Sequence, residues 1–309
     1  MPFHEIYRKQ VELLLRVLPI VAEESCFALK GGTAINLFVR DLPRLSVDID
    51  LTYLPIADRK SSLDEIESAL MRIKENITAS SSNLKISESH PSTQDTTTRL
   101  IIRASSGEQV KIETTPVMRG VIFPATRRSV TTQVEKQFGF AETNVVSHAD
   151  LYAGKIVATL DRQHPRDLFD VSLLLEEEGI STELRSALIV YMICHKRSPD
   201  SLLRGPLRDL SHDYENNFRG MTTIGVSLEE LNRTYTTLVD DLIKNMPDNH
   251  KEFLVTFYLG VPDWDLLELP DVQDLPAVRW RQRNLEAAGN ETLQSISNNI
   301  RGLLGMSLS

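Results

Sequence analysis

Residues 44–53, which read RLSVDIDLTY, constrain the fold most strongly because polar and apolar side chains alternate along them. A period of two predicts a half-buried β-strand whose successive side chains point to opposite faces of a sheet. Asp48 and Asp50 then lie on the same face. Two aspartates on one strand face repel each other, and aspartate has poor strand propensity. Exposure of that face to solvent therefore does not explain why both residues are there. Two such carboxylates can chelate a hard divalent cation together.

A pair of glycines comes shortly before this strand. Residues 26–30 are short and apolar and predict a strand, Gly31 and Gly32 predict a tight turn, and residues 33–39 predict a helix with Thr33 near its N-cap. Glycine lets a backbone approach an anion closely, and the free N–H groups at the start of a helix point toward phosphate. Gly31, Gly32 and Thr33 are therefore candidate phosphate-binding residues.

A third acid follows on a later predicted strand. Residues 109–115 form a hairpin with residues 97–104 across the turn Ser-Ser-Gly-Glu, and Lys111 and Glu113 share one face of the second strand. Phosphoryl-transfer sites of the two-metal kind use several carboxylates to hold cations about 4 Å apart. Asp48, Asp50 and Glu113 are therefore the candidate metal ligands, with Mg²⁺ as the expected ion and Mn²⁺ as a possible substitute.

The rest of the chain divides near residue 145. Residues 5–24 and 58–77 have helical spacing and residues 84–89 read as a strand, whereas 80–83 and 91–95 are polar loops. After residue 147 helices are expected at 148–160, 166–178, 182–194, 227–244 and 251–259, with one or two more in 278–303. We therefore expect an α+β domain over residues 1–145 and an all-helical domain over residues 146–309.

Composition excludes several classes of protein. The 309 residues carry a net charge of −9, and residues 151–309 hold 16 Lys and Arg against 24 Asp and Glu, so sequence-blind binding of nucleic acid over the whole surface is not expected. Two cysteines are too few for a disulfide framework or a zinc site, which fits a reducing compartment. No apolar run approaches 18 residues and the N-terminus does not resemble a signal peptide. A cytoplasmic protein without a membrane segment is the expectation.

The segments KGGTAINLF at 30–38 and RLSVDIDL at 44–51 resemble the AbiEii/AbiGii family of bacterial toxins. That family has a nucleotidyltransferase fold of the DNA polymerase β superfamily and occurs in toxin–antitoxin and abortive-infection systems. The resemblance implies a mixed sheet with flanking helices and a first motif running from Gly32 and Thr33 to Asp48 and Asp50. A second family motif, Lys-x-Asp, is similar to Lys111-x-Glu113, with Glu in place of Asp.

Two later motifs of the family match further residues. The family carries a lysine within a helix, which is similar to Lys155, and then an Arg-Asp-x-x-Asp stretch, which is similar to Arg166, Asp167 and Asp170. Lys155 and Arg166 are candidate cations for the triphosphate of a nucleotide. Asp167 or Asp170 would orient Lys155 or act as general base on the acceptor hydroxyl. The resemblance covers roughly residues 5–180.

The resemblance implies an enzyme that binds an NTP with Mg²⁺ and transfers NMP to RNA, with the 3′ end of tRNA as the acceptor, thereby blocking translation. It also implies a cognate antitoxin encoded nearby. Two alternatives remain open: a catalytically silent nucleotide-binding subunit of a toxin–antitoxin pair, and a transferase that modifies a protein hydroxyl. One further motif, RWRQR at 279–283, combines cations with an aromatic ring that RNA could contact, although an amphipathic helix covering the core is the plainer interpretation.

Overall fold

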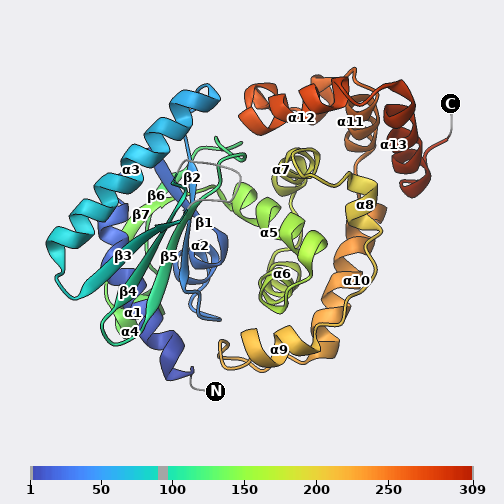
Figure 1. The fold of residues 1–309 in the computed structure, drawn as a ribbon. Coiled ribbons are helices and arrows are strands. Elements are labelled where there is room, and N and C mark those ends of the chain that lie inside the picture. Colours follow the sequence, from blue (N-terminus) through green and yellow to red (C-terminus); the bar gives the residue numbers. More distant parts are fainter. Residues whose placement is uncertain (1–2, 90–96, 308–309) are drawn as a thin grey trace. The chain divides into compact units, whose positions relative to one another are not determined.

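The computed structural model describes residues 3–89 and 97–307, so the loop expected at 91–95 lies outside the described residues. The chain forms two compact units (Figure 1). The first consists of residues 1–147 together with residues 218–225, and the second of residues 148–217 and 226–309. The domain boundary expected near residue 145 stays a prediction. It did not include the return of residues 218–225 to the first unit.

The first unit is built on a mixed sheet. Within the described residues it has seven strands in the order β3-β4-β5-β2-β1-β7-β6. Strand β2 pairs in parallel with β5, β1 pairs in parallel with β7, and the other neighbours are antiparallel. The bounds are β1 Phe27–Lys30, β2 Asp48–Tyr53, β3 Leu84–Ser89, β4 Arg99–Ala104, β5 Gln109–Thr114, β6 Thr126–Ser129 and β7 Glu142–Val145.

Helices α1 (Glu5–Val21) and α3 (Arg59–Ser80) pack against each other and against the strands (Figure 1). The apolar positions of α1 recur at helical spacing, and Val11, Leu14 and Leu18 are fully buried. Pro19 lies in the last turn of α1, which ends two residues later. Helix α3 begins where the Asp58 carboxylate accepts a hydrogen bond from the Ser61 N–H at 3.0 Å.

Helix α2 (Gly31–Ala34) follows β1 without a connecting turn and continues as a π-helical segment, η1 (Ile35–Val39). The sequence predicted a turn at the glycines and a helix starting at Thr33. In the structure the helix starts at Gly31, and Thr33 lies inside it and is fully buried. The expected N-cap role of Thr33 is therefore wrong. Helix α4 (Thr132–Phe138), β6 and β7 were not predicted.

The second unit is helical. Its helices are α5 (His148–Arg162), α6 (Pro165–Glu177), α7 (Thr182–Ile193), α8 (Pro199–Leu203), α9 (Ser211–Asn217), α10 (Leu228–Lys244), α11 (Asp248–Tyr258), α12 (Pro276–Glu286) and α13 (Asn290–Leu303), with short 3₁₀ turns η2 (Trp264–Leu267) and η3 (Val272–Asp274). Pro165 occupies the first turn of α6, where a missing N–H costs nothing. Among the described residues no helix is long and apolar enough to cross a membrane.

Candidate functional site

Asp48 and Asp50 lie on β2 as the alternation predicted. Both side chains are half-buried, and Ile49 between them is fully buried on the opposite face. Strand β5 runs parallel to β2 in a register that sets Asp48 beside Lys111 and Asp50 beside Glu113. Paired residues of neighbouring strands project to the same side of a sheet, so the three predicted acids share one face.

Gly31 is pressed against one of these acids. Its φ is +72°, a left-handed conformation that side chains other than glycine rarely adopt, and a Cβ at this position would lie 2.4 Å from Oδ2 of Asp50. Gly32 has a similar constraint, since a Cβ there would lie 2.7 Å from a guanidinium nitrogen of Arg44 and 2.9 Å from Oγ of Ser46. Gly31 is thus favoured by its φ and lies close to the predicted metal-binding carboxylate, whereas the neighbours of Gly32 are the ends of side chains.

Thr33 connects the helix to the acidic strand. Its hydroxyl lies 2.5 Å from the backbone oxygen of Asp48 and 3.0 Å from Oγ of Ser46. With its hydroxyl occupied in this way, Thr33 fixes α2 against the start of β2. It therefore contributes to the site by holding the backbone at Asp48 in place.

Four charged residues form a row across adjacent strands, which we call the charge row: Arg99 on β4, Glu113 on β5, Asp50 on β2 and Lys30 on β1. Arg99 holds both oxygens of Glu113, with N–O distances of 2.6 and 3.1 Å. Lys30 donates to the hydroxyl of Thr115 at 2.7 Å. Burial lowers the pKa of Lys30, whereas Asp50 and Glu113 oppose that shift. The two central acids are thus flanked by cations.

The oxygen donors on this face suit a divalent cation that is shared with a substrate. Asp48 and Asp50 are adjacent oxygen donors on one face, which suits Mg²⁺ bound through one or two carboxylates with substrate phosphates and water. The third predicted ligand, Glu113, is paired with Arg99 in this structure. Within the described part of the chain, no cluster of three His, Cys, Asp or Glu side chains is arranged to hold a metal by itself. The residues therefore fit a metal held jointly with a nucleotide.

The second unit holds a buried ion-pair cluster, formed by Lys155 on α5 and by Asp167 and Asp170 on α6. The Lys155 ammonium lies 2.9 Å from both carboxylates, and all three side chains are at most 6% exposed. Arg162 also contacts Asp167, at 2.5 and 3.1 Å. Burial alone would raise the pKa of Asp167, but Lys155 and Arg162 outweigh it and hold that pKa well below its usual range.

The remaining predicted residue, Arg166, is half-buried in the first turn of α6, where its N–H donates to Nδ1 of His164 at 3.1 Å. The structure brings the side chains of Lys155, Asp167 and Asp170 together. The sequence did not point to Arg99 as the partner of Glu113, or to Arg162 as a partner of Asp167. Arg99 lies within an expected strand, but only the register of β4 against β5 reveals that it faces Glu113.

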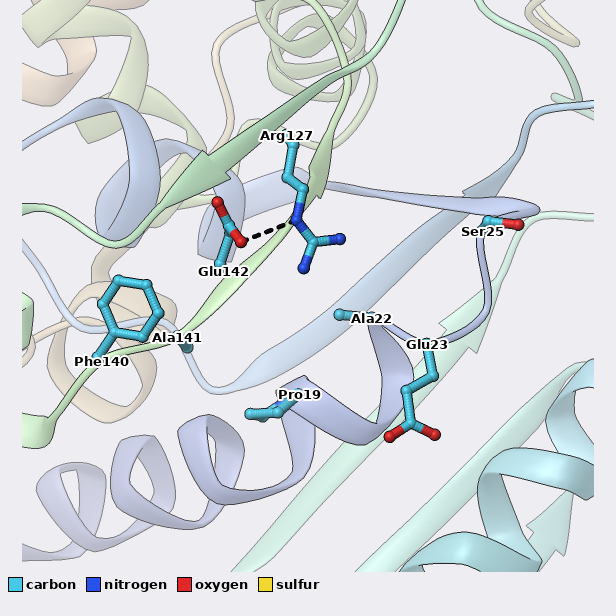
Figure 2. Close-up of a pocket in the computed structure, with 8 residues that line it drawn as sticks. All are labelled: Pro19, Ala22, Glu23, Ser25, Arg127, Phe140, Ala141 and Glu142. Carbon is cyan, nitrogen blue, oxygen red and sulfur yellow. Dashed lines mark hydrogen bonds and ion pairs between the residues drawn. The ribbon is translucent and has the colours of Figure 1, made fainter.

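A separate hollow of about 490 Å³ lies in the first unit between the end of α1 and strands β6 and β7 (Figure 2). Figure 2 shows Arg127 and Glu142 paired at its wall, at 2.8 Å, with Phe140 at its rim. None of the predicted site residues lines this hollow. The candidate site is therefore the face of β2, β5 and α2 described above.

The mixed sheet, the acidic pair on β2 and the glycine-led helix beside it define the nucleotidyltransferase class. The fold is similar to the solved structure of MenT4, a nucleotidyltransferase toxin from Mycobacterium tuberculosis H37Rv. That match has a TM-score of 0.59 and 13% sequence identity and covers 97% of this chain and 94% of that one. A search of curated protein sequences returns no match.

The family model described as nucleotidyl transferase AbiEii toxin, Type IV TA system, matches residues 12–279. The chain belongs to this family and is a nucleotidyltransferase toxin of a toxin–antitoxin system, so an antitoxin is among its partners. The expected α+β fold, a nucleotidyltransferase mixed sheet with flanking helices followed by C-terminal helices, is confirmed.

Proposed function

We propose that this toxin is a cytoplasmic, Mg²⁺-dependent enzyme that transfers NMP from an NTP to a hydroxyl of RNA, with the 3′ end of tRNA as acceptor. The observation that carries the proposal is the placement of the Asp48 and Asp50 carboxylates on one face, with Gly31 packed against Asp50. Mg²⁺, or Mn²⁺ in its place, would be held by these two acids and would supply positive charge to the phosphates.

The residues around the acidic pair have complementary roles in this proposal. The backbone at Gly31, Gly32 and Thr33 binds phosphate through free N–H groups at the start of α2. The acceptor hydroxyl oxygen forms a bond to the α-phosphorus and its proton passes to water. The bond from that phosphorus to the bridging oxygen breaks, and pyrophosphate leaves. Glu113 becomes the third carboxylate of the metal site when its ion pair with Arg99 breaks. The Arg99–Glu113 ion pair therefore belongs to the proposed site.

The buried cluster has a second role in the same proposal. Within the second unit, Lys155 and Arg166 are the candidate cations for phosphate oxygens. A general base works best when its pKa is near the working pH, and Lys155 and Arg162 keep the Asp167 carboxylate ionised far below that range. Asp167 and Asp170 therefore serve by orienting Lys155, in preference to accepting the proton of the acceptor hydroxyl.

The proposal is tested with each α-³²P-labelled NTP, Mg²⁺ and total tRNA. Wild type is expected to label RNA with at least one NTP, and Asp48→Asn to reduce the rate by about 100-fold or more, because even supporting residues of metal sites cost about 10- to 100-fold. Asp64→Asn is the matched control, since this carboxylate is 61% exposed and pairs with Lys60 on α3.

Three results would contradict the proposal. Labelling that is equal in wild type and Asp48→Asn would remove the metal-binding role of β2. Label on protein in place of RNA would show a protein-modifying transferase. Nucleotide binding by calorimetry without turnover of any acceptor would show a silent subunit. Expression with and without a candidate antitoxin encoded next to the toxin, scored by growth arrest, tests the partner.

A further inference from the structure

Helix α12 covers the core with one face and leaves a basic aromatic face open. Ala277, Val278 and Leu285 are buried, as the amphipathic interpretation of this segment required. On the other side Arg279, Trp280 and Arg283 are exposed, and we call these three residues the exposed α12 face. At spacings of three and four residues, Arg283 is a neighbour of both Trp280 and Arg279 on the helix surface.

Trp280 differs from the other tryptophan of the chain. Trp264 packs against Phe253 and Phe257, with ring centroids 5.2 and 6.0 Å away. Trp280 is 47% exposed, and within the described part of the chain its indole makes no ring contact or hydrogen bond. Burying an indole is favourable, so an open one on a rigid helix is available for a flat partner.

The arginines stand out against the charge of their surroundings. The second unit holds 15 Lys and Arg against 25 Asp and Glu, a net charge of −10, yet three arginines fall within five residues of α12. Arg279 pairs with Asp274 at 2.7 Å, and Arg281 lies over the ring of Tyr258. Arg283 has no ion pair among the described residues. A local cationic site on an acidic unit favours a small stretch of polyanion.

We propose that the exposed α12 face binds a single-stranded segment of the acceptor RNA, with one base stacked on Trp280 and phosphates paired with Arg283 and Arg279. The inference rests on the proposed function, in which the acceptor is RNA. Aromatic stacking beside arginine is the usual means of holding single strands without reading their sequence. A protein partner fits less well, because the exposed neighbours of Trp280 on this helix are charged or polar, and a protein interface needs a larger apolar centre.

The test measures RNA binding without NTP, so that it does not depend on catalysis. A fluorescein-labelled 12-nucleotide single-stranded RNA of mixed sequence and total tRNA are titrated against the full chain in the Asp48→Asn background. Trp280→Ala is expected to weaken binding about tenfold, whereas Trp280→Phe retains most of it. Arg283→Ala is expected to weaken binding several-fold and to reduce the slope of log K against log salt by about 0.7.

Arg233→Ala is the matched control, because it removes the same charge from an exposed position on α10. A second readout is intrinsic fluorescence: RNA should quench wild type, and the quenching should disappear in Trp280→Phe, where only Trp264 remains. Circular dichroism melts confirm that each variant is folded.

The inference is overturned if wild type does not bind either RNA, or if Trp280→Ala and Arg283→Ala bind as tightly as Arg233→Ala. It is also overturned if Trp280→Ala leaves RNA binding intact but abolishes neutralisation by the antitoxin, which would make the face a protein interface. Its failure is separable from that of the proposed function. Loss of NMP transfer in every assay would not affect the binding measurements, and normal transfer with unchanged RNA binding in the variants would refute this inference alone.

Discussion

Gly31 is the residue at which backbone conformation and chemistry are most tightly joined. Gly31→Ala places a methyl group 2.4 Å from Oδ2 of Asp50 and imposes strain at φ +72°, so we expect NMP transfer to fall by at least about tenfold. Gly107→Ala is the control, because its φ is +105° but a Cβ there meets nothing within 4 Å. The control should lose stability without losing transfer in labelled-NTP assays. Equal transfer losses in the two variants would mean that contact with Asp50 is irrelevant.

Arg99 competes for a carboxylate that the proposed reaction needs. Arg99→Gln frees Glu113, so we expect the Mg²⁺ concentration that gives half-maximal transfer to fall about two- to fivefold, the size of a partly exposed ion pair. Arg103→Gln on the same strand, which hydrogen-bonds Gln109 at 2.9 Å, is the control. The measurement is a Mg²⁺ titration of initial rates. An unchanged or higher Mg²⁺ requirement in Arg99→Gln would indicate that Glu113 does not join the metal site.

The positions of the acidic side chains on their strands could be predicted from the sequence. A strict period of two is enough to set Asp48 and Asp50 on one face, and the same period applies to Lys111 and Glu113. The ion pair of Arg99 with Glu113 was not accessible, because strand register depends on contacts between segments rather than on the pattern within one. The Thr33 hydroxyl was misassigned for a related reason: its partner lies 15 residues away on β2.

At the scale of elements, the contact between α5 and α6 contains a buried charge. Lys155→Met removes the cation between Asp167 and Asp170, and Asp170 is fully buried. We expect a loss of about 3 kcal/mol or more in the free energy of unfolding. Lys244→Met, which breaks an exposed pair with Asp240, should cost less than about 1 kcal/mol. Urea unfolding measures both losses, and a similar small loss in the two variants would show that the cluster is hydrated.

The packing of α11 beside α7 gives a pH dependence. His250 is 2% exposed, and burial, aided by Arg185 and opposed by Glu268, lowers its pKa below 6.5. Below pH 6.5 the unfolded chain takes up a proton that the folded chain does not, so stability falls as the pH falls. Between pH 7.5 and pH 5.5 the free energy of unfolding of wild type should therefore decrease. In His250→Gln that decrease should be smaller by about 1 kcal/mol. Stability is measured by urea unfolding at each pH, with His212→Gln, at an exposed position, as the control that should behave like wild type. If the free energy of unfolding depends on pH in the same way in all three proteins, the burial of His250 does not cause the dependence.

Long elements with a clear period were predictable and short ones were not. Helices α3 and α10 agree with the expected ranges to within a few residues, because a helical apolar stripe and an N-cap mark each of them. Strand β6 has four residues, all exposed, and therefore carries no alternation. It exists because β7 offers it a backbone partner, and that information is not contained in residues 126–129.

At the scale of the whole molecule, the chain returns to its first unit after 70 residues spent in the second. In that return the N–H of Leu45 donates to the oxygen of Met221 at 2.8 Å, and Arg44 forms a β-bridge with Thr222. Phe218 and Met221 are almost completely buried. A boundary drawn from the change in sequence pattern near residue 145 could not include this segment, because nothing in residues 218–225 indicates a partner so far away in the sequence.

A discontinuous unit predicts how fragments behave. Residues 1–147 alone should unfold at a lower temperature than the same residues joined to 217–226 by a Gly/Ser linker of about 20 residues. Burying Phe218 and Met221 contributes about 1.5–3 kcal/mol each, and 1 kcal/mol corresponds to about 3 °C in a unit of this size, so the difference should be on the order of 10 °C. Circular dichroism melts measure it, with Phe218→Ser and Met221→Ser in the joined fragment as the control. Should the short fragment melt at the same temperature as the joined one, residues 218–225 would be a peripheral attachment, and the first unit would be complete at residue 147.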